Sequence, residues 1–192
     1  RMLSERAAVR RPVLAVGWRV QQGLSMLVGL VLLAGLNPML DPGATVVAVP
    51  VFNELLLGFA LPGVLAAAAA RAEASAWPPQ FRAVLAGYAL VSLLAWVTLE
   101  VRRYFQPLAM ALDLAPPGGA ELYAYSFAWL AFGACLLALG VQHGSRVLRL
   151  AALGVIGLTV LKAFLVDMGG LGGLWRVLSF LGLGLALIAL GW

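Results

Sequence analysis

The sequence is poor in the residues that build most catalytic and metal-binding sites. It has one cysteine, Cys135, and one histidine, His143, so it can form no internal disulfide and offers no Cys/His cluster for a metal. We interpret Cys135 as a small buried residue and His143 as a residue of a short polar loop. The sequence therefore predicts no metal site and no cofactor, and it leaves any catalytic residue unknown.

Charged residues are scarce as well. They make up 11% of the 192 residues, whereas 63% are hydrophobic, and the mean hydropathy is +0.99. Soluble domains are usually about one quarter charged, so the composition predicts an integral membrane protein. The net charge of +5 comes from arginines gathered in particular loops. In a membrane protein such clusters set orientation, and we expect no nucleic-acid partner.

Long hydrophobic runs account for most of the chain. A membrane-spanning helix needs about 20 mostly apolar residues, and loops rich in Pro, Gly and Asp separate the candidate runs. Six runs meet the requirement, over residues 18–37, 50–70, 82–104, 121–140, 148–167 and 173–192. We predict an all-α integral membrane protein, with a basic cytoplasmic or interfacial segment over 1–17 and a six-helix bundle over 18–192.

The basic residues also predict an orientation. With the N-terminus inside, nine arginines fall on the inner side and four basic residues on the outer side, which favours both ends inside. The inner set is Arg1, Arg6, Arg10, Arg11, Arg19, Arg71, Arg82, Arg146 and Arg149, and the outer set is Arg102, Arg103, Lys162 and Arg176. Because the chain starts at Arg1 and stops at Trp192 near an apolar run, we expect it to belong to a longer multi-pass protein. The bilayer and further helices of that protein would then be its partners.

Small residues predict where helices approach each other. On the fourth run, residues such as Ala124, Ala128 and Cys135 recur every three or four positions, which favours close helix packing in lipid. We expect Gly29, Gly154 and Gly157 to act in the same way. Pro62 lies inside the second run, where the loss of a backbone donor should kink the helix.

Several charges lie near the predicted outer ends of the runs. A charge at mid-membrane costs roughly 2.5–3.5 kcal/mol, so such groups usually pair, face the bundle interior or reach an interface. We expect Asp167 to pair with Arg176, and Lys162 to reach Glu54 or Glu100. The full cluster predicted at the outer rim comprises Glu54, Glu100, Arg102, Arg103, Glu121, Lys162, Asp167 and Arg176. It would either lock helices together or form a pocket for a headgroup, sugar or ion.

The C-terminal half resembles a known family. Its segments ELYAYSFAWLAFGACLLALG (121–140) and RVLRLAALGVIGLTVLKAFLVDMGGLGGLWRVLSFLGLGLALIALGW (146–192) resemble the end of bacterial predicted membrane proteins called domain of unknown function 2339. Matching positions are Lys162, Phe164, Leu165, Asp167, Arg176, Ser179, Phe180, Leu183 and Gly184, and the match is loose over the first 80 residues. The resemblance implies a multi-pass bacterial inner-membrane protein of the cell envelope, and it brings no reaction.

Three functions remain open at this point. The leading one is a non-enzymatic membrane module whose outward charged cluster locks helices and binds a polar ligand, headgroup or partner. The second is a transporter or ion pathway that uses Lys162, Glu54 and Asp167 as coupling groups. The third is a membrane-embedded enzyme acting on a lipid-linked sugar or headgroup. In the enzyme, Glu100, Glu121 or Asp167 would be the base, and Arg103 or Arg176 would hold phosphate.

Overall fold

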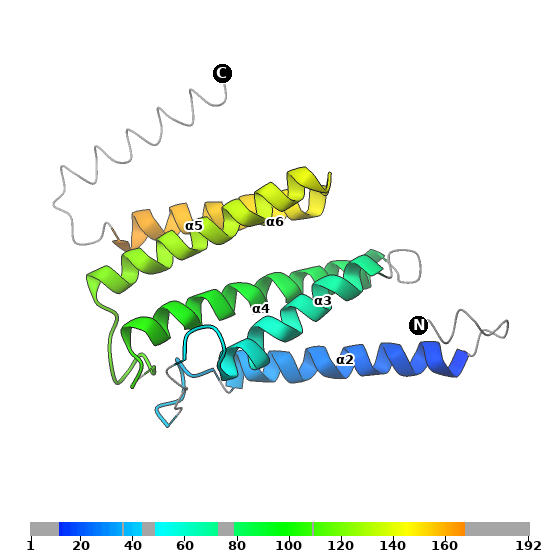
Figure 1. Cartoon of the computed structure of the whole chain (residues 1–192), viewed down its shortest axis with the longest axis horizontal. Coiled ribbons are helices and arrows are strands. Elements are labelled where there is room, and N and C mark those ends of the chain that lie inside the picture. The colour runs from blue at the N-terminus through cyan, green and yellow to red at the C-terminus, as the bar shows by residue number, and fades with distance from the viewer. Residues whose placement is uncertain (1–11, 36, 44–48, 73–78, 109, 168–192) are drawn as a thin grey trace, which may run out of the picture. The chain divides into compact units, whose positions relative to one another are not determined.

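The computed structural model describes residues 12–35, 37–43, 49–72, 79–108 and 110–167. Within these ranges every regular element is a helix (Figure 1). The elements are α2 (Pro12–Gly35), the π-helical stretch η1 (Leu56–Ala60), α3 (Leu61–Ala72), α4 (Pro79–Phe105), α5 (Gly119–Gln142) and α6 (Arg146–Leu165). The first residues of α2 and α4 are prolines, whose fixed φ and missing N–H suit the first turn of a helix.

The predicted runs correspond to these helices with shifted boundaries. Helix α2 begins six residues before the predicted run 18–37, and the second run is helical only from Glu54 onward. Helices α4, α5 and α6 are long and apolar enough to cross a membrane, whereas Gly23–Gly35 and Leu56–Arg71 are shorter apolar stretches. The all-helical prediction is confirmed for the described ranges. The sixth run, 173–192, lies outside them, so the count of six spans and the orientation stay predictions.

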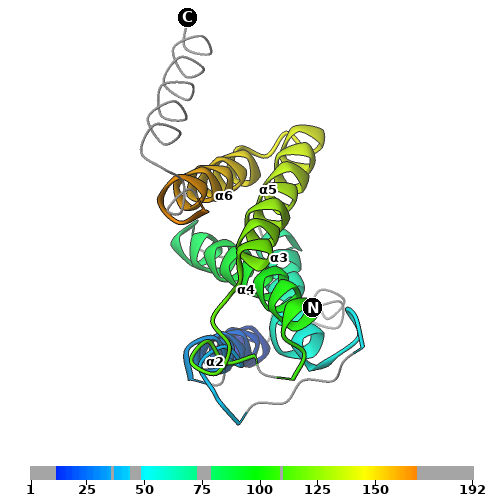
Figure 2. The ribbon, with the colours of Figure 1, turned by 90° about the vertical axis from the view of Figure 1, so that its left-hand side faces the viewer.

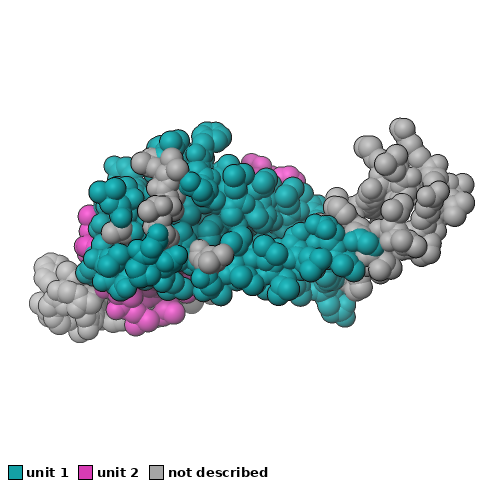
Figure 3. Space-filling model, turned by 90° about the horizontal axis from the view of Figure 1, so that it is seen from below, with its two compact units in different colours: residues 1–116 teal, residues 117–192 magenta. Residues whose placement is uncertain are grey.

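The chain divides into two compact units, residues 1–116 and 117–192, which Figure 3 distinguishes by colour. In the first unit α2, η1 and α3 pack against α4. The packing is tight at glycines: a Cβ at Gly29 would collide with the ring and hydroxyl of Tyr88 on α4, and one at Gly63 would lie 2.9 Å from Leu93 Cγ. The end of the Tyr88 side chain therefore packs directly on Gly29, and the closer approach of two backbones at this glycine stays a prediction.

The irregular stretch η1 ends two residues before Pro62. It is a π-helical turn, a feature frequently found at functional sites, and the kink at Pro62 stays a prediction. The hydroxyl of Ser92, on α4, donates to the main-chain carbonyl oxygen of Phe59 at 2.6 Å, and both residues are buried. A side chain of α4 therefore satisfies a carbonyl of the irregular turn, which matters because lipid offers no replacement donor.

The second unit contains the antiparallel pair α5 and α6, which lie side by side in Figures 1 and 2. The turn between them uses Gly144 in the left-handed region, with φ of 61°. Ser145 caps α6, because its hydroxyl accepts from the N–H of Leu148 at 3.4 Å. The short, capped turn forces the two helices into contact along their length.

The face of α5 that meets α6 is made by residues spaced seven apart, which lie on one side of a helix. A Cβ at Gly133 would lie 2.7 Å from Ile156 Cγ1, and one at Gly140 would lie 2.9 Å from the main-chain nitrogen of Arg149. Ser126 continues the row. This row of small residues forms part of the contact between α5 and α6.

The expected burial of Cys135 is wrong, because it is exposed on α5. Gly154 and Gly157 are exposed on α6, and among the described residues no atom lies near the position of an added Cβ. They take no part in the contact with α5, and their packing against another helix stays a prediction. The buried face of α6 instead carries Ala152, Val155 and Thr159. Small size alone could not tell which side of each helix faces the neighbour.

Candidate functional site

A polar cluster joins α5 and α6 at one end of the second unit. The Lys162 ammonium, in the last turn of α6, lies 2.6 Å from Asp167 Oδ1. It also donates to the carbonyl oxygen of Leu122 at 2.6 Å and to the hydroxyl of Ser126 at 2.9 Å, both on α5. The other oxygen of Asp167 accepts from Ser126 at 2.5 Å. We call Leu122, Ser126, Lys162 and Asp167 the Lys162 cluster.

The hydrogen-bonding capacity of Lys162 is fully used by this arrangement. An ammonium group has three donors, and the structure gives it three acceptors. The side chains are largely withdrawn from solvent, with 14% of Lys162 and 3% of Asp167 exposed. Lys162 is the only lysine of the chain. Its ionic partner is Asp167, five residues later, which the end of α6 brings beside it. The expected contact of Lys162 with Glu54 or Glu100 concerns both units and stays a prediction.

Two further residues of α5 extend the cluster. The ring of Tyr125 lies with its centroid 6.0 Å from the Lys162 ammonium, within reach of a cation–π contact. The Tyr125 hydroxyl donates to Glu121 Oε1 at 2.6 Å, and Glu121 is 1% exposed. Glu121 lies in the first turn of α5, where the helix dipole favours a negative charge.

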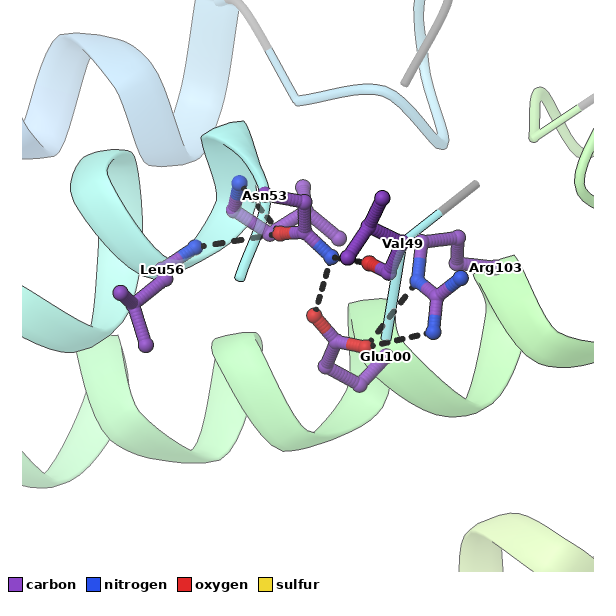
Figure 4. Close-up of polar contacts among 6 residues, drawn as sticks. Val49, Asn53, Leu56, Glu100 and Arg103 are labelled. Atoms are coloured by element: carbon purple, nitrogen blue, oxygen red, sulfur yellow. Dashed lines mark hydrogen bonds and ion pairs between the residues drawn. The ribbon is translucent and has the colours of Figure 1, made fainter. Parts of the chain in front are cut away.

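A second polar cluster joins the start of the second run to α4 within the first unit (Figure 4). The Asn53 amide donates to Glu100 Oε1 at 2.7 Å and to the carbonyl oxygen of Val49 at 3.0 Å. The other oxygen of Glu100 accepts from Arg103, whose Nε and Nη2 both lie 3.0 Å away. We call Asn53, Glu100 and Arg103 the Glu100 cluster. Both carboxylate oxygens of Glu100 are therefore bonded within the protein.

Arg102 does not join either cluster. Its side chain is fully buried, and its guanidinium donates to main-chain carbonyl oxygens in the segment after α4. Nε donates to Met110 at 2.8 Å, and Nη2 donates to Ala111 at 2.9 Å and to Ala115. A guanidinium offers five N–H donors in a fixed fork, which suits several acceptors at once. Arg102 thus fixes a loop, a role that its sequence position did not indicate.

The predicted rim residues fall into different environments. Lys162 and Asp167 lie together, Glu100 and Arg103 lie together, and Glu121 lies beside Tyr125. Glu54 is on the exposed side of its helix, and Arg176 lies outside the described residues. The prediction that all these residues gather at one outer rim involves both units, and it stays a prediction. In the described part of the chain, no group of three or more His, Cys, Asp or Glu side chains could hold a metal ion.

The sequence analysis identified none of the neutral side chains that bond these groups. They are Asn53, which bonds Glu100, Ser126, which bonds Lys162 and Asp167, and Ser92, which bonds the carbonyl oxygen of Phe59. Asn53 could have been singled out from the sequence, because burying an amide in an apolar run costs free energy unless the amide is hydrogen-bonded. The serines carried no such signal, since serine commonly bonds to its own helix in membrane segments.

Comparison with protein families agrees with the helical membrane character. A family model described as "Predicted membrane protein (DUF2339)" matches residues 2–192. The chain belongs to the DUF2339 family. The match extends the resemblance from the C-terminal half to nearly the whole sequence, including the first 80 residues, and places this DUF2339 protein in the lipid bilayer. No curated protein and no solved structure matches the chain.

Proposed function

We propose that this DUF2339 chain is a non-enzymatic, multi-pass module of a bacterial inner membrane, in which buried polar clusters lock neighbouring helices. The observation that carries the proposal is the saturation of Lys162 by acceptors from α5 and from Asp167. A charge that is paired and fully hydrogen-bonded can be kept within a helix contact at tolerable cost. The cluster then favours one register of α5 on α6.

The same geometry weighs against the two rival functions. A coupling lysine of a transporter needs a donor or a lone pair that can face a pathway, and the three donors of Lys162 point at protein acceptors. A general base needs a carboxylate oxygen that can approach substrate. Asp167 and Glu100 have both oxygens occupied by protein donors. Locking is therefore the function that these residues support best.

The proposed topology has the clusters at the outer side. Basic residues lie at the opposite ends of the same helices, with Arg71 in the last turn of α3, Arg82 near the start of α4, and Arg146 at the start of α6. The connection 106–118 joins α4 to α5, so the joined ends face the same side if both helices cross. The positive-inside rule then favours the clusters outside and both termini inside.

The proposal is tested by a double-mutant cycle on the ion pair. Removing one partner of a buried pair costs roughly 3–5 kcal/mol, so Lys162→Met and Asp167→Asn should each destabilise the full chain in detergent, at the lower end of that range. The double variant should lose less than the sum, with a coupling energy of roughly 1–3 kcal/mol. Unfolding is followed by circular dichroism during titration with SDS.

Arg146→Met is the matched control, because Arg146 is an exposed basic residue at the other end of the same helix. It should change stability by no more than about 0.5 kcal/mol. Additive single effects, or a Lys162→Met variant as stable as Arg146→Met, would contradict the locking function. A proteoliposome ion flux that Lys162→Met abolishes without loss of stability would favour the pathway instead.

A further inference from the structure

The chain after α4 turns back along the helix instead of leaving it. Met110 is 1% exposed and belongs to a buried apolar cluster with Leu99, Leu55 and Phe59. Leu99 lies six residues before the end of α4, which is about 9 Å along a helix axis. We call residues 106–108 and 110–116 the fold-back loop, and Figure 1 shows this stretch curling beside the C-terminal end of α4. The loop therefore reaches the depth of the last two turns of the helix.

Several main-chain polar groups of the fold-back loop are satisfied from inside the protein. Arg102 supplies donors to the carbonyl oxygens of Met110, Ala111 and Ala115. The N–H of Leu112 donates to the carbonyl oxygen of Met39 at 3.0 Å, in the turn after α2. A loop in water needs no such provision, because water bonds to free carbonyls. In hydrocarbon, each unsatisfied group costs several kcal/mol, and irregular backbone persists only where the protein itself supplies partners.

Apart from Asp113, the side chains that the loop exposes are apolar. Leu108 is 96% exposed, and Leu112 and Leu114 are also exposed. Phe52, in the neighbouring segment before η1, is 78% exposed. Tyr104, at the end of α4, is exposed too, and tyrosine is enriched at the level of lipid headgroups. The apolar side chains thus gather at the end of a membrane helix, beside a residue typical of the interface.

We propose that the fold-back loop is a lipid-inserted loop, whose leucines enter the leaflet at the C-terminal end of α4 while Arg102 holds its carbonyls. The occupant of this surface is the lipid bilayer, since carbonyl oxygens that are bonded by a buried side chain of the protein are what hydrocarbon demands. Insertion would add the leucines of the loop to the membrane-embedded surface of the first unit. The inference rests on the proposed function only in requiring that α4 crosses the membrane.

The test places single nitroxide labels in the full chain, reconstituted in phosphatidylcholine and phosphatidylglycerol vesicles after Cys135→Ala. The labelled variants are Leu108→Cys in the loop, Val91→Cys on the exposed face of α4, and Asp113→Cys as an exposed polar site of the same loop. Power saturation compares collisions with oxygen, which concentrates in lipid, and with a nickel chelate, which stays in water. Position 108 should favour oxygen several-fold, as position 91 does, and position 113 should favour nickel.

The outcomes distinguish insertion of the loop into lipid from the crossing of the membrane by α4. Nickel preference at position 108 with oxygen preference at 91 overturns lipid insertion and leaves the spanning helix intact. Nickel preference at both positions overturns the spanning of α4 as well. Low collision rates with both reagents at 108 mean that a second copy or another protein covers the loop, which also overturns lipid as the occupant.

A second variant tests the part played by Arg102. Arg102→Met keeps an unbranched apolar stem in place of the arginine's aliphatic part and removes every donor, so the label at position 108 should shift toward nickel while the label at 91 is unchanged. An unchanged oxygen preference at 108 would overturn the role assigned to Arg102.

Discussion

Gly133 offers a sharp test of how α5 and α6 meet. An added Cβ would lie 2.7 Å from Ile156 Cγ1, whereas ordinary contacts begin at 3.4 Å, so Gly133→Ala requires a movement of about 0.7 Å. Overpacking of this kind costs about 1–3 kcal/mol. Alanine also gains up to about 1 kcal/mol over glycine in a helix interior, which obscures the packing term if one variant is measured alone.

Gly154→Ala removes that ambiguity, because Gly154 lies within the facing helix with open space around it. The gain in helix propensity is common to both variants, so the difference between them isolates the packing cost. We expect Gly154→Ala to be neutral or stabilising and Gly133→Ala to be less stable than it by about 1–3 kcal/mol. SDS titration in mixed micelles, followed by circular dichroism, measures both.

A rescue variant identifies the colliding group. Ile156→Ala should cost less in the Gly133→Ala background than in the original chain, because it removes the atom that the new methyl group meets. Equal stability of Gly133→Ala and Gly154→Ala would refute the contact between α5 and α6 described here.

Two predictions concern the first unit. Ser92→Ala leaves a buried carbonyl of η1 without its donor and should lower the free energy of unfolding by about 1–3 kcal/mol. Ser25→Ala is the control, because the Ser25 hydroxyl bonds its own helix at an exposed site, and it should change stability by less than about 0.5 kcal/mol. Equal thermal midpoints of the two variants would contradict this role of Ser92. Asn53→Asp places a second carboxylate beside Glu100, so it should lower the midpoint more than Asn53→Ala does, and the reverse order would show that Asn53 does not face Glu100.

Much of the helical architecture follows from the sequence, because long apolar runs bounded by proline and glycine leave few alternatives to helices in lipid. The boundaries near Phe105 and Gly140 could be predicted within a few residues for this reason. The failure at residues 50–53 has a different cause. These residues are apolar enough for a helix, but the side-chain oxygen of Asn53 accepts from the N–H groups of Leu55 and Leu56. This arrangement is typical of a helix start, and hydropathy does not register it.

The polar clusters could be predicted only in part. The scarcity of charge singled out Lys162, Asp167, Glu100 and Arg103 as residues that need partners, and in the structure Lys162 pairs with Asp167 and Glu100 with Arg103. The choice of partner depended on where the backbone travels after each helix ends, as with Asp167 beyond α6 and the loop around Arg102. The path of the chain after a helix depends on turn geometry and packing, which the hydrophobic pattern of the sequence does not predict.

The most direct test of the account uses the fact that Lys162 is the only lysine. A membrane-impermeant amine-reactive ester is applied to the full chain in vesicles, from outside and, after loading, from inside, and mass spectrometry locates the label. The account predicts that Lys162 stays unmodified from both sides and reacts fully once SDS unfolds the chain, with the N-terminal amine as the internal control. Rapid acylation of Lys162 in the folded protein would contradict the claim that its ammonium is held by three acceptors of the protein.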